Sequence, residues 1–154
     1  MDVALPEALV VAANAGASNA VAAWLNEGGG VDARCAEQDN TTLLIVAAAG
    51  GQEVLVRMLL QRGASVNLQD SYGSAALMHA ASNGHTTIVQ ALLDAKADPL
   101  LLTSTMNGKT ALMAAEHYKH AAVAQLLRQH AKRQAVEAEV RAAAKAAHAA
   151  ATAD

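Results

Sequence analysis

The sequence predicts an all-α fold built as an array of repeated helical hairpins. Short apolar stripes with helical i, i+3, i+4 spacing recur along the chain, for example Leu77, Ala80 and Ala81. A helix of about ten residues is not stable alone in water, so each stripe needs a neighbour of the same kind to cover it. Glycines follow the first three stripes at intervals of 35 and 33 residues. These glycines are Gly16, Gly51 and Gly84.

The repeating unit is clearest between Asp70 and Asp98, where a turn, a short helix, a glycine break and a second helix follow one another. Asp70 and Gly73 have the chemistry of a turn, and Gly84 ends the first helix because glycine readily adopts positive φ. The apolar positions of this copy are Leu77, Ala80, Ala81, Ile88, Val89, Leu92 and Leu93. Their counterparts are Leu9, Ala12, Ala13, Val21, Trp24 and Leu25 in a first copy, Leu44, Ala47, Ala48, Val56, Leu59 and Leu60 in a second, and Leu112, Ala115, Val123, Leu126 and Leu127 in a fourth.

A turn followed by two helices in about 33 residues resembles the ankyrin-repeat family, and the resemblance covers about residues 5–128. We expect an ankyrin-repeat solenoid of four helix-turn-helix repeats joined by β-turn loops. The expected domain is 1–130, with repeats at about 5–36, 37–69, 70–104 and 105–130, and an alanine-rich helical tail at 131–154. The resemblance implies a concave face, formed by turn tips and inner helices, that binds another protein.

The first two copies have recognisable helix boundaries. Pro6 suits the first helical position, and the helices of the first copy are expected to run to about Ala13 and over 19–26, with Trp24 packed under the edge of the array. The second copy is expected to have helices over 42–49 and 53–61. Asn40 stands where the turn glycine belongs and tolerates the left-handed conformation.

The last two copies depart from the pattern. Lys96 replaces the glycine that ends the second copy, and the loop over 100–106 is expected to be an extended finger rather than a strand. In the fourth copy Glu116 replaces a packed alanine and Lys119 replaces the helix-breaking glycine. Terminal repeats are polar on their outer side because nothing stacks there, so these changes indicate a cap.

The tail from Ala131 onward consists largely of Ala, Lys, Arg and Glu. Alanine has the highest helix propensity, which predicts a third helix or an extension of the last one, fraying after about Ala146. The tail could shield the end of the stack. A nucleic-acid-binding or calmodulin-binding tail is an alternative, although its mixed charges argue against it.

The opening of the first helix also departs from the family. The family usually has Thr-Pro-Leu-His there, whereas this chain has Thr-Leu-Leu-Ile, Ala-Ala-Leu-Met and Thr-Ala-Leu-Met from Thr42, Ala75 and Thr110. The resemblance implies that the missing residues carry a hydrogen-bond network, so the tightness of the turns stays open. His79 lies one position past the family's histidine and should not inherit its role, while His85 is expected to be structural.

Composition excludes several classes of function. The net charge of −3 and an aromatic content of 2% do not suit nucleic-acid binding. Cys35 is the single cysteine, which favours a reducing compartment, the cytoplasm with the nucleus not excluded. We expect no secretory signal and no membrane span, since the longest apolar stretch, 43–49, is shorter than the roughly 20 residues required.

No motif indicates catalysis or a cofactor. His117 and His120 share an i, i+3 spacing, but a structural zinc ion would need four ligands, usually with several cysteines. Cys35, expected in a polar loop, has no matching base for nucleophilic chemistry. The three glycines at 28–30 do not form a phosphate-binding motif. We therefore expect no metal, no cofactor and no enzyme.

The predicted partner-binding face combines turn tips with exposed positions of the inner helices. It comprises Gln38, Asp39, Thr41, Ser71, Tyr72, Ser74, Ser82, Asn83, Met106, Asn107, Lys109, His117 and Tyr118. Both tyrosines of the chain fall in this set, and tyrosine is enriched at interface hot spots; alternatively, they only cover neighbouring turns. The sequence predicts a monomeric adaptor, scaffold or stoichiometric inhibitor, or else an assembly element that oligomerises through its C-terminal helix.

Overall fold

The computed structural model describes residues 3–104 and 107–153, and this part of the chain forms eight α-helices and no strand longer than an isolated bridge. The helices pair along the chain into four hairpins, which confirms the predicted all-α solenoid. They are α1 (Glu7–Asn14), α2 (Ser18–Asn26), α3 (Leu43–Ala49), α4 (Glu53–Gln61), α5 (Ala76–Ser82), α6 (Thr86–Asp94), α7 (Ala111–His117) and α8 (Ala121–Ala151).

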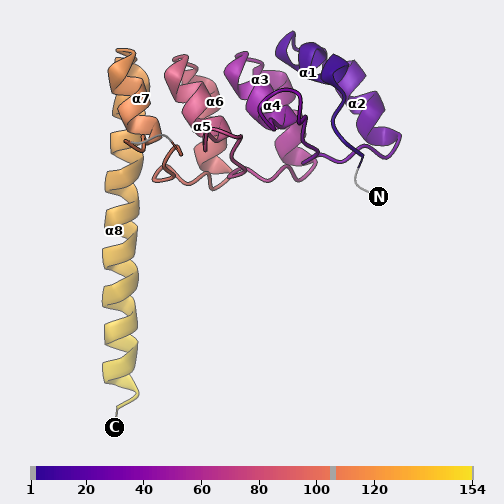
Figure 1. Cartoon of the computed structure of the whole chain (residues 1–154). Helices are drawn as coiled ribbons and strands as arrows, with labels where there is room; N and C mark the ends of the chain where they lie inside the picture. Colours follow the sequence, from indigo (N-terminus) through magenta and orange to yellow (C-terminus); the bar gives the residue numbers. More distant parts are fainter. Residues whose placement is uncertain (1–2, 105–106, 154) are drawn as a thin grey trace.

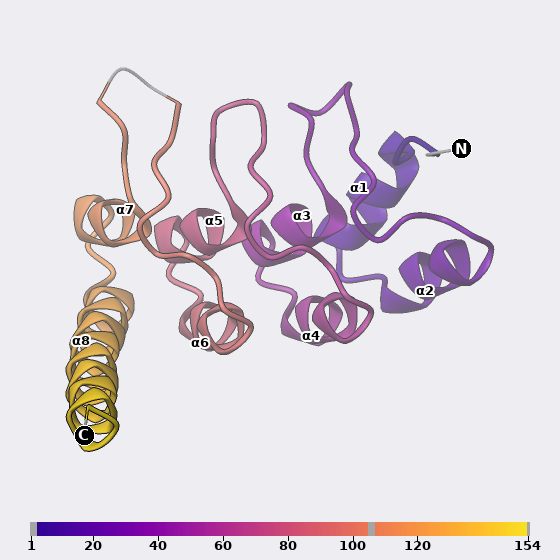
Figure 2. The same cartoon turned by 90° about the horizontal axis from the view of Figure 1, so that it is seen from below.

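The helices form two layers. Helices α1, α3, α5 and α7 lie side by side in an inner row, and α2, α4, α6 and the start of α8 form an outer row. The loops between hairpins project as fingers from the same side of the inner row (Figure 2). The fingers and the inner helices together therefore form one continuous face, which is the concave face of the array.

The core lies between the two layers and between successive hairpins. Leu59 and Leu92 of the outer row are fully buried, and so are Ala48 and Ala81 of the inner row. Alanines at these positions let the backbones of adjacent inner helices approach closely. Trp24 is only partly buried, against the backbone of Gly29 at the edge of the array, as the sequence predicted.

Successive hairpins are joined by a side chain that reaches back to the preceding inner helix. The Nε2 atom of His85 lies 3.2 Å from the carbonyl oxygen of Ala49, and Nε2 of His120 lies 2.9 Å from that of Ser82. Gln52 donates in the same way to Asn14, at 2.9 Å. Each bond satisfies a carbonyl at a helix end that has no partner within its helix.

These contacts explain why glycine ends the inner helices. Gly84 has a φ of +73°, and a Cβ on it would lie 2.6 Å from the ring of His120. Lys119 occupies the equivalent place in the last hairpin with a φ of +62°, and no further repeat packs over it there. Glu116 is exposed at the same end and forms an ion pair with Arg128 at 2.6 Å. Both substitutions fit the predicted cap.

The fingers are tied by a network that does not need the absent Pro and His. Arg34 donates to the carbonyls of Asn40 (2.9 Å) and Gln69 (2.8 Å). Gln69 in turn donates to the carbonyls of Gly73 (2.8 Å) and Leu102 (3.1 Å). The bonds from Arg34 to Gln69 and from Gln69 to Leu102 cross between hairpins, so each finger is held by the next one along the chain.

The turns and helix starts have the backbone conformations that their residue types favour. Asn40 and Lys96 both have positive φ, at 58° and 70°. The side chains of Thr42 and Thr110 accept hydrogen bonds from backbone N–H groups in the first turns of α3 and α7. Of the 100–106 loop, the described part forms a finger without a strand, and residues 105 and 106 lie outside the described residues.

Cys35 corrects an expectation. The sequence placed it in a polar loop, but its side chain is fully buried in the core. Its backbone N–H donates to the carbonyl of Thr41 at 3.0 Å, across the base of the first finger. The loop closes over the thiol because the first residues of the finger pair with the last ones.

Helix α8 extends the outer row and then leaves the stack. Val123, Ala124 and Leu127 pack into the core, whereas every described residue from Ala131 onward is exposed. The helix continues to Ala151 and projects away from the array (Figure 1). The tail therefore extends the last helix and does not shield the end of the stack. Fraying of its end and the exact repeat boundaries stay predictions.

A pair of glycine substitutions tests the role of the close contact at Gly84. Gly63 also has positive φ, at 86°, but a Cβ there would meet nothing within 4 Å. We expect Gly63→Ala to lower the free energy of unfolding by about 1 kcal/mol, because alanine disfavours the left-handed region. Gly84→Ala should cost about 2–4 kcal/mol, because it also displaces His120. Urea unfolding monitored by circular dichroism measures both, and equal losses would contradict the contact.

Candidate functional site

The face between the fingers and the inner helices carries the predicted site. The predicted residues that the structure describes all come from the fingers, the inner helices or the turns that follow them. Met106 lies outside the described residues. Two hollows in this face divide it along the array, one over α1 and α3 and the other over α5 and α7.

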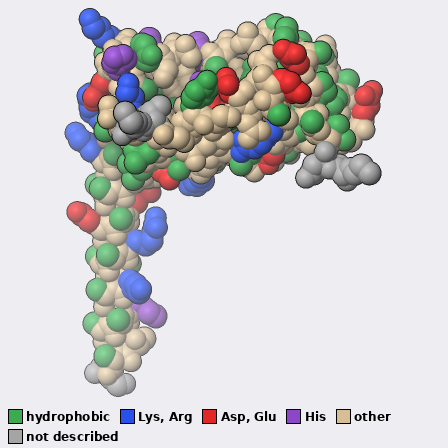
Figure 3. Space-filling model, viewed as in Figure 1, with side chains coloured by type: hydrophobic (Ala, Val, Ile, Leu, Met, Phe, Trp, Pro, Cys, Tyr) green, Lys and Arg blue, Asp and Glu red, His purple; other side chains and the backbone are tan. Residues whose placement is uncertain are grey.

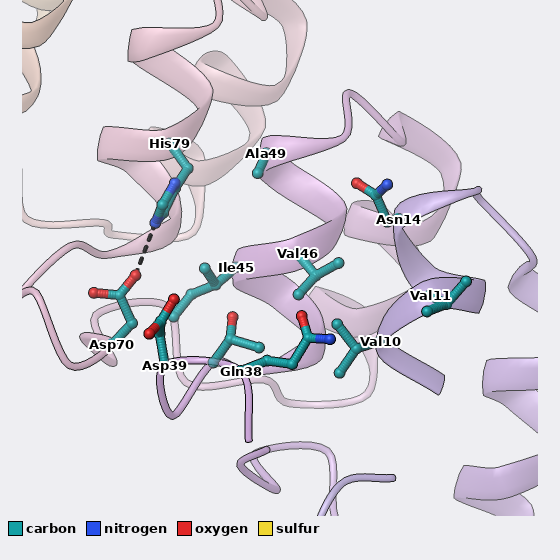
Figure 4. Close-up of a pocket in the computed structure, with 11 residues that line it drawn as sticks. Val10, Val11, Asn14, Gln38, Asp39, Ile45, Val46, Ala49, Asp70 and His79 are labelled. Atoms are coloured by element: carbon teal, nitrogen blue, oxygen red, sulfur yellow. Dashed lines mark hydrogen bonds and ion pairs between the residues drawn. The ribbon is translucent and has the colours of Figure 1, made fainter. Parts of the chain in front are cut away.

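The first hollow has a volume of about 330 Å³. Five apolar side chains, which we call its floor, and six polar side chains line it (Figure 4). The apolar lining consists of Val10 and Val11 from α1 and Ile45, Val46 and Ala49 from α3. The polar lining consists of Asn14, Gln38, Asp39, Thr41, Asp70 and His79. An apolar floor with a few polar groups around it is typical of a surface that accommodates a ligand side chain.

Asp70 organises the second finger beside this hollow. Its carboxylate accepts hydrogen bonds from the backbone N–H groups of Tyr72 and Ser74, both at 3.0 Å. Its other oxygen lies 3.0 Å from Nε2 of His79 on α5 (Figure 4). The Asp70 side chain is only 6% exposed, so these three contacts fix it in place. His79 therefore tethers the finger to the inner helix.

The first finger presents its side chains differently. Asp39 is exposed at the finger tip with a φ of 53°, and its backbone carbonyl accepts a bond from Ser71 of the next finger at 2.8 Å. Gln38 donates to Glu7 of α1 at 2.9 Å. The backbone of this finger is thus held from both sides while the Asp39 carboxylate stays open to solvent.

The second hollow is smaller, about 120 Å³, and its charge is different. Lys109 from the third finger and His117 from α7 line it, together with Tyr118. The rings of His117 and Tyr118 meet edge to face, with centroids 4.8 Å apart. The other lining residues are Ser74, Met78, Ser82, Thr103, Thr110 and Ala114.

Both predicted tyrosines are available on the surface. Tyr72 is 56% exposed and Tyr118 is 58% exposed. Tyr72 stands at the tip of the second finger, where its carbonyl accepts a bond from Ser104 of the third finger. More than half of each tyrosine remains uncovered, so both rings have surface that a partner could contact.

The remaining predicted residues differ in how exposed their side chains are and in whether other residues of the chain already bind them. Thr41 is only 7% exposed and forms the closing end of the first finger opposite Cys35, but it also lines the first hollow, so its role in partner binding stays a prediction. Asn83 is exposed but donates to the carbonyl of His79. Asn107 is exposed on the third finger, and Ser71 serves through its backbone.

Sequence reasoning missed the apolar floor. The predicted face contains no apolar residue of the first hairpin, yet Val10 and Val11 line the first hollow. The signal was present, since Val11 and Val46 occupy the same register as His79, two positions after the repeated leucine. A register position shared with a surface histidine faces the concave side even when it is apolar.

The two histidines considered as metal ligands, His117 and His120, have different surroundings. His120 contacts the carbonyl of Ser82, while His117 lines the second hollow. Among the described residues, no three His, Cys, Asp or Glu side chains are grouped so that they could hold a metal ion. In the same part of the chain, no helix is both long and apolar enough to cross a bilayer.

A family model of ankyrin repeats (three copies) matches residues 9–103 and, in a second overlapping match, residues 72–141. The chain therefore belongs to the ankyrin-repeat family. Ankyrin repeats are generally modules for protein–protein interaction and are typically not enzymes. This agrees with a face that offers hollows and exposed aromatic side chains.

Relatives share parts of this array. Ankyrin repeat domain-containing protein 63 of Homo sapiens is 40% identical over 72 residues, which are 47% of this chain and 18% of that protein. An ankyrin repeat-containing protein of Treponema pallidum is 40% identical over 80 residues, 51% of this chain and 26% of that protein. A rice protein (Oryza sativa subsp. japonica) described as "Probable E3 ubiquitin-protein ligase XBOS33" is 41% identical over 63 residues, 41% of this chain and 12% of that protein. The chain thus spans a quarter or less of the lengths of most of these relatives.

The burial of Cys35 predicts that its thiol reacts slowly with labelling reagents. Burial raises the pKa of the Cys35 thiol, and its hydrogen bond to Glu37 acts in the same direction. A raised pKa keeps the thiol protonated to a higher pH than an exposed cysteine, and only the thiolate reacts. We expect 5,5′-dithiobis(2-nitrobenzoate) to label the folded chain at least about a hundredfold more slowly than the urea-unfolded chain, because the loop must open first. Equal rates would contradict the burial.

Proposed function

We propose that this chain binds another protein through the concave face of its ankyrin array and acts as an adaptor, scaffold or stoichiometric inhibitor. One observation carries the proposal: two hollows lie on the same face, Tyr118 lines the second, and Tyr72 stands on the finger that contributes Asp70 to the first and Ser74 to the second. Both tyrosines are more than half exposed. Tyrosine contributes a large contact area with few rotatable bonds. The partner would be held by surface complementarity, without a chemical step.

The rigidity of the face supports this function. Backbone bonds link the first finger to the second and the second to the third, from Ser71 to Asp39 and from Ser104 to Tyr72, both at 2.8 Å. A surface that is held in place before binding loses less conformational entropy on association. We propose a monomer that acts in the cytoplasm, where a single buried cysteine stays reduced.

Substituting the tyrosines tests the proposal. We expect Tyr72→Ala and Tyr118→Ala each to weaken partner binding by about 1–2 kcal/mol, as truncation of an interface tyrosine does. Helicity and melting temperature should not change, because both rings lie largely outside the core. The measurement is a quantitative pull-down from cell lysate, with immobilised wild type beside the double variant.

Val54→Ser provides the control, since Val54 is 74% exposed on outer helix α4, away from the concave face. Proteins that bind through the concave face should be retained by the wild type and the control and lost with the double variant. Retention of the same proteins in the same amounts by all three would exclude this face.

The tail supports a second candidate function, assembly through the C-terminal helix. Val136 and Val140 lie at i, i+4 on α8 and are 58% and 63% exposed. An alanine-rich helix with no tertiary packing is only marginally stable, so pairing with another helix would stabilise it. In this case the chain would act as a structural element that joins copies of itself.

Light scattering distinguishes the two candidates. If the tail mediates assembly, the full chain should be an oligomer, and both deletion of 131–154 and the pair Val136→Gln/Val140→Gln should convert it to a monomer. Glutamine has a higher helix propensity than valine, so the pair removes the apolar contact while keeping the helix. A full chain that is already monomeric would reject assembly and leave the concave face as the site.

A further inference from the structure

The two hollows of the concave face differ in charge. The first is lined by the carboxylates of Asp39 and Asp70, the latter paired with His79, and, among the described residues, by no Lys or Arg. The second is lined by Lys109 and His117 and, within the same described residues, by no Asp or Glu. In the space-filling view, several acidic side chains lie over the half of the molecule that contains α1 and α3, where basic side chains are also visible below the helices (Figure 3). Basic and histidine side chains lie near α7, with acidic ones among them. The face is therefore polarised along the array.

The two carboxylates of the first hollow are not equivalent. The Asp70 carboxylate is used by two backbone N–H groups and by His79. The Asp39 carboxylate, in contrast, makes no hydrogen bond or ion pair with any other residue that the structure describes, and it is exposed at the rim. Asp39 is thus the acidic group that is free to accept a charged donor.

The apolar floor beside Asp39 favours a cationic side chain that has a long aliphatic stem. Val11 is 63% exposed, and together with Val10, Ile45 and Val46 it forms an apolar surface next to the free carboxylate. Lysine and arginine bury an aliphatic stem along such a surface while the charged end reaches a polar group. A fully apolar side chain would leave Asp39 without a partner, and an acidic one would be repelled by it.

We propose that the bound segment of the partner is basic and apolar: a lysine or arginine flanked by apolar residues enters the first hollow. Its stem lies along Val11 and Val46, and its charged group pairs with Asp39. Lys109 disfavours a cation at the second hollow, so the cationic side chain is directed to the first. This inference rests on the proposed function, because it specifies the partner of the same concave face.

Selection from a display library of random linear peptides on the immobilised full chain tests the inference. Enriched peptides should contain Lys or Arg next to apolar residues more often than the starting library does. Individual synthetic peptides from the enriched pool are then the probes, measured by fluorescence anisotropy. Their affinity should fall as NaCl concentration rises, because a charge pair at the rim is screened by salt.

Substitution of Asp39 is the decisive variant. Asp39→Asn removes the charge but keeps a side chain that tolerates positive φ, so the finger should fold unchanged. We expect binding of the basic peptides to weaken about fivefold or more, as for a charge pair that becomes partly buried. Asp94→Asn, an exposed position on outer helix α6 where the same change is made, should leave the affinity unchanged.

The outcomes separate this inference from the proposed function. Enriched peptides without basic residues, bound equally by the wild type and Asp39→Asn but weakly by the Tyr72→Ala/Tyr118→Ala variant, would overturn the inference and leave the concave face as the site. Binding that none of the concave-face variants alters would overturn both. An enriched pool that does not differ from the starting library would also count against the inference.

Discussion

The array depends on one recurring contact, in which a side chain from each hairpin caps the end of the preceding inner helix. Gln52, His85 and His120 make this contact from the first position after the turn. The contact satisfies a carbonyl that would otherwise lack a partner, and it brings successive inner helices close enough for their alanines to pack. Three of these bonds join the four hairpins into one stack.

The same contact explains how the two ends of the array differ from its middle. Between hairpins, the residue beneath the capping side chain must be glycine, because a Cβ would collide with the incoming ring or amide. At the last hairpin no further helical hairpin of the described chain packs above, and Lys119 takes the same backbone conformation there. Conformation alone tolerates lysine there, whereas conformation together with close packing requires glycine.

The concave face is a consequence of the stack. Once the inner helices are in register, the fingers lie beside one another and exchange backbone hydrogen bonds, so each finger positions the next. Asp70 shows how this produces a site, since its carboxylate shapes its own finger and also holds His79 on the helix behind it. The free carboxylate of Asp39 and the exposed side chain of Val11 on α1 are then presented on a surface that is already ordered.

The fold could be predicted from the sequence, because a 33-residue period of short apolar stripes and glycine breaks is compatible with few structures other than stacked hairpins. The positive φ of Asn40 and Lys96 was also predictable, since position in the repeat defines the backbone conformation. The direction of α8 after the stack, the burial of Cys35 and Thr41, and the apolar floor formed by Val10, Val11, Ile45 and Val46 were decided only by the tertiary structure. Periodicity tells which side of a helix faces a neighbour, but whether a residue at the edge of that side is covered depends on how far the next finger reaches over it.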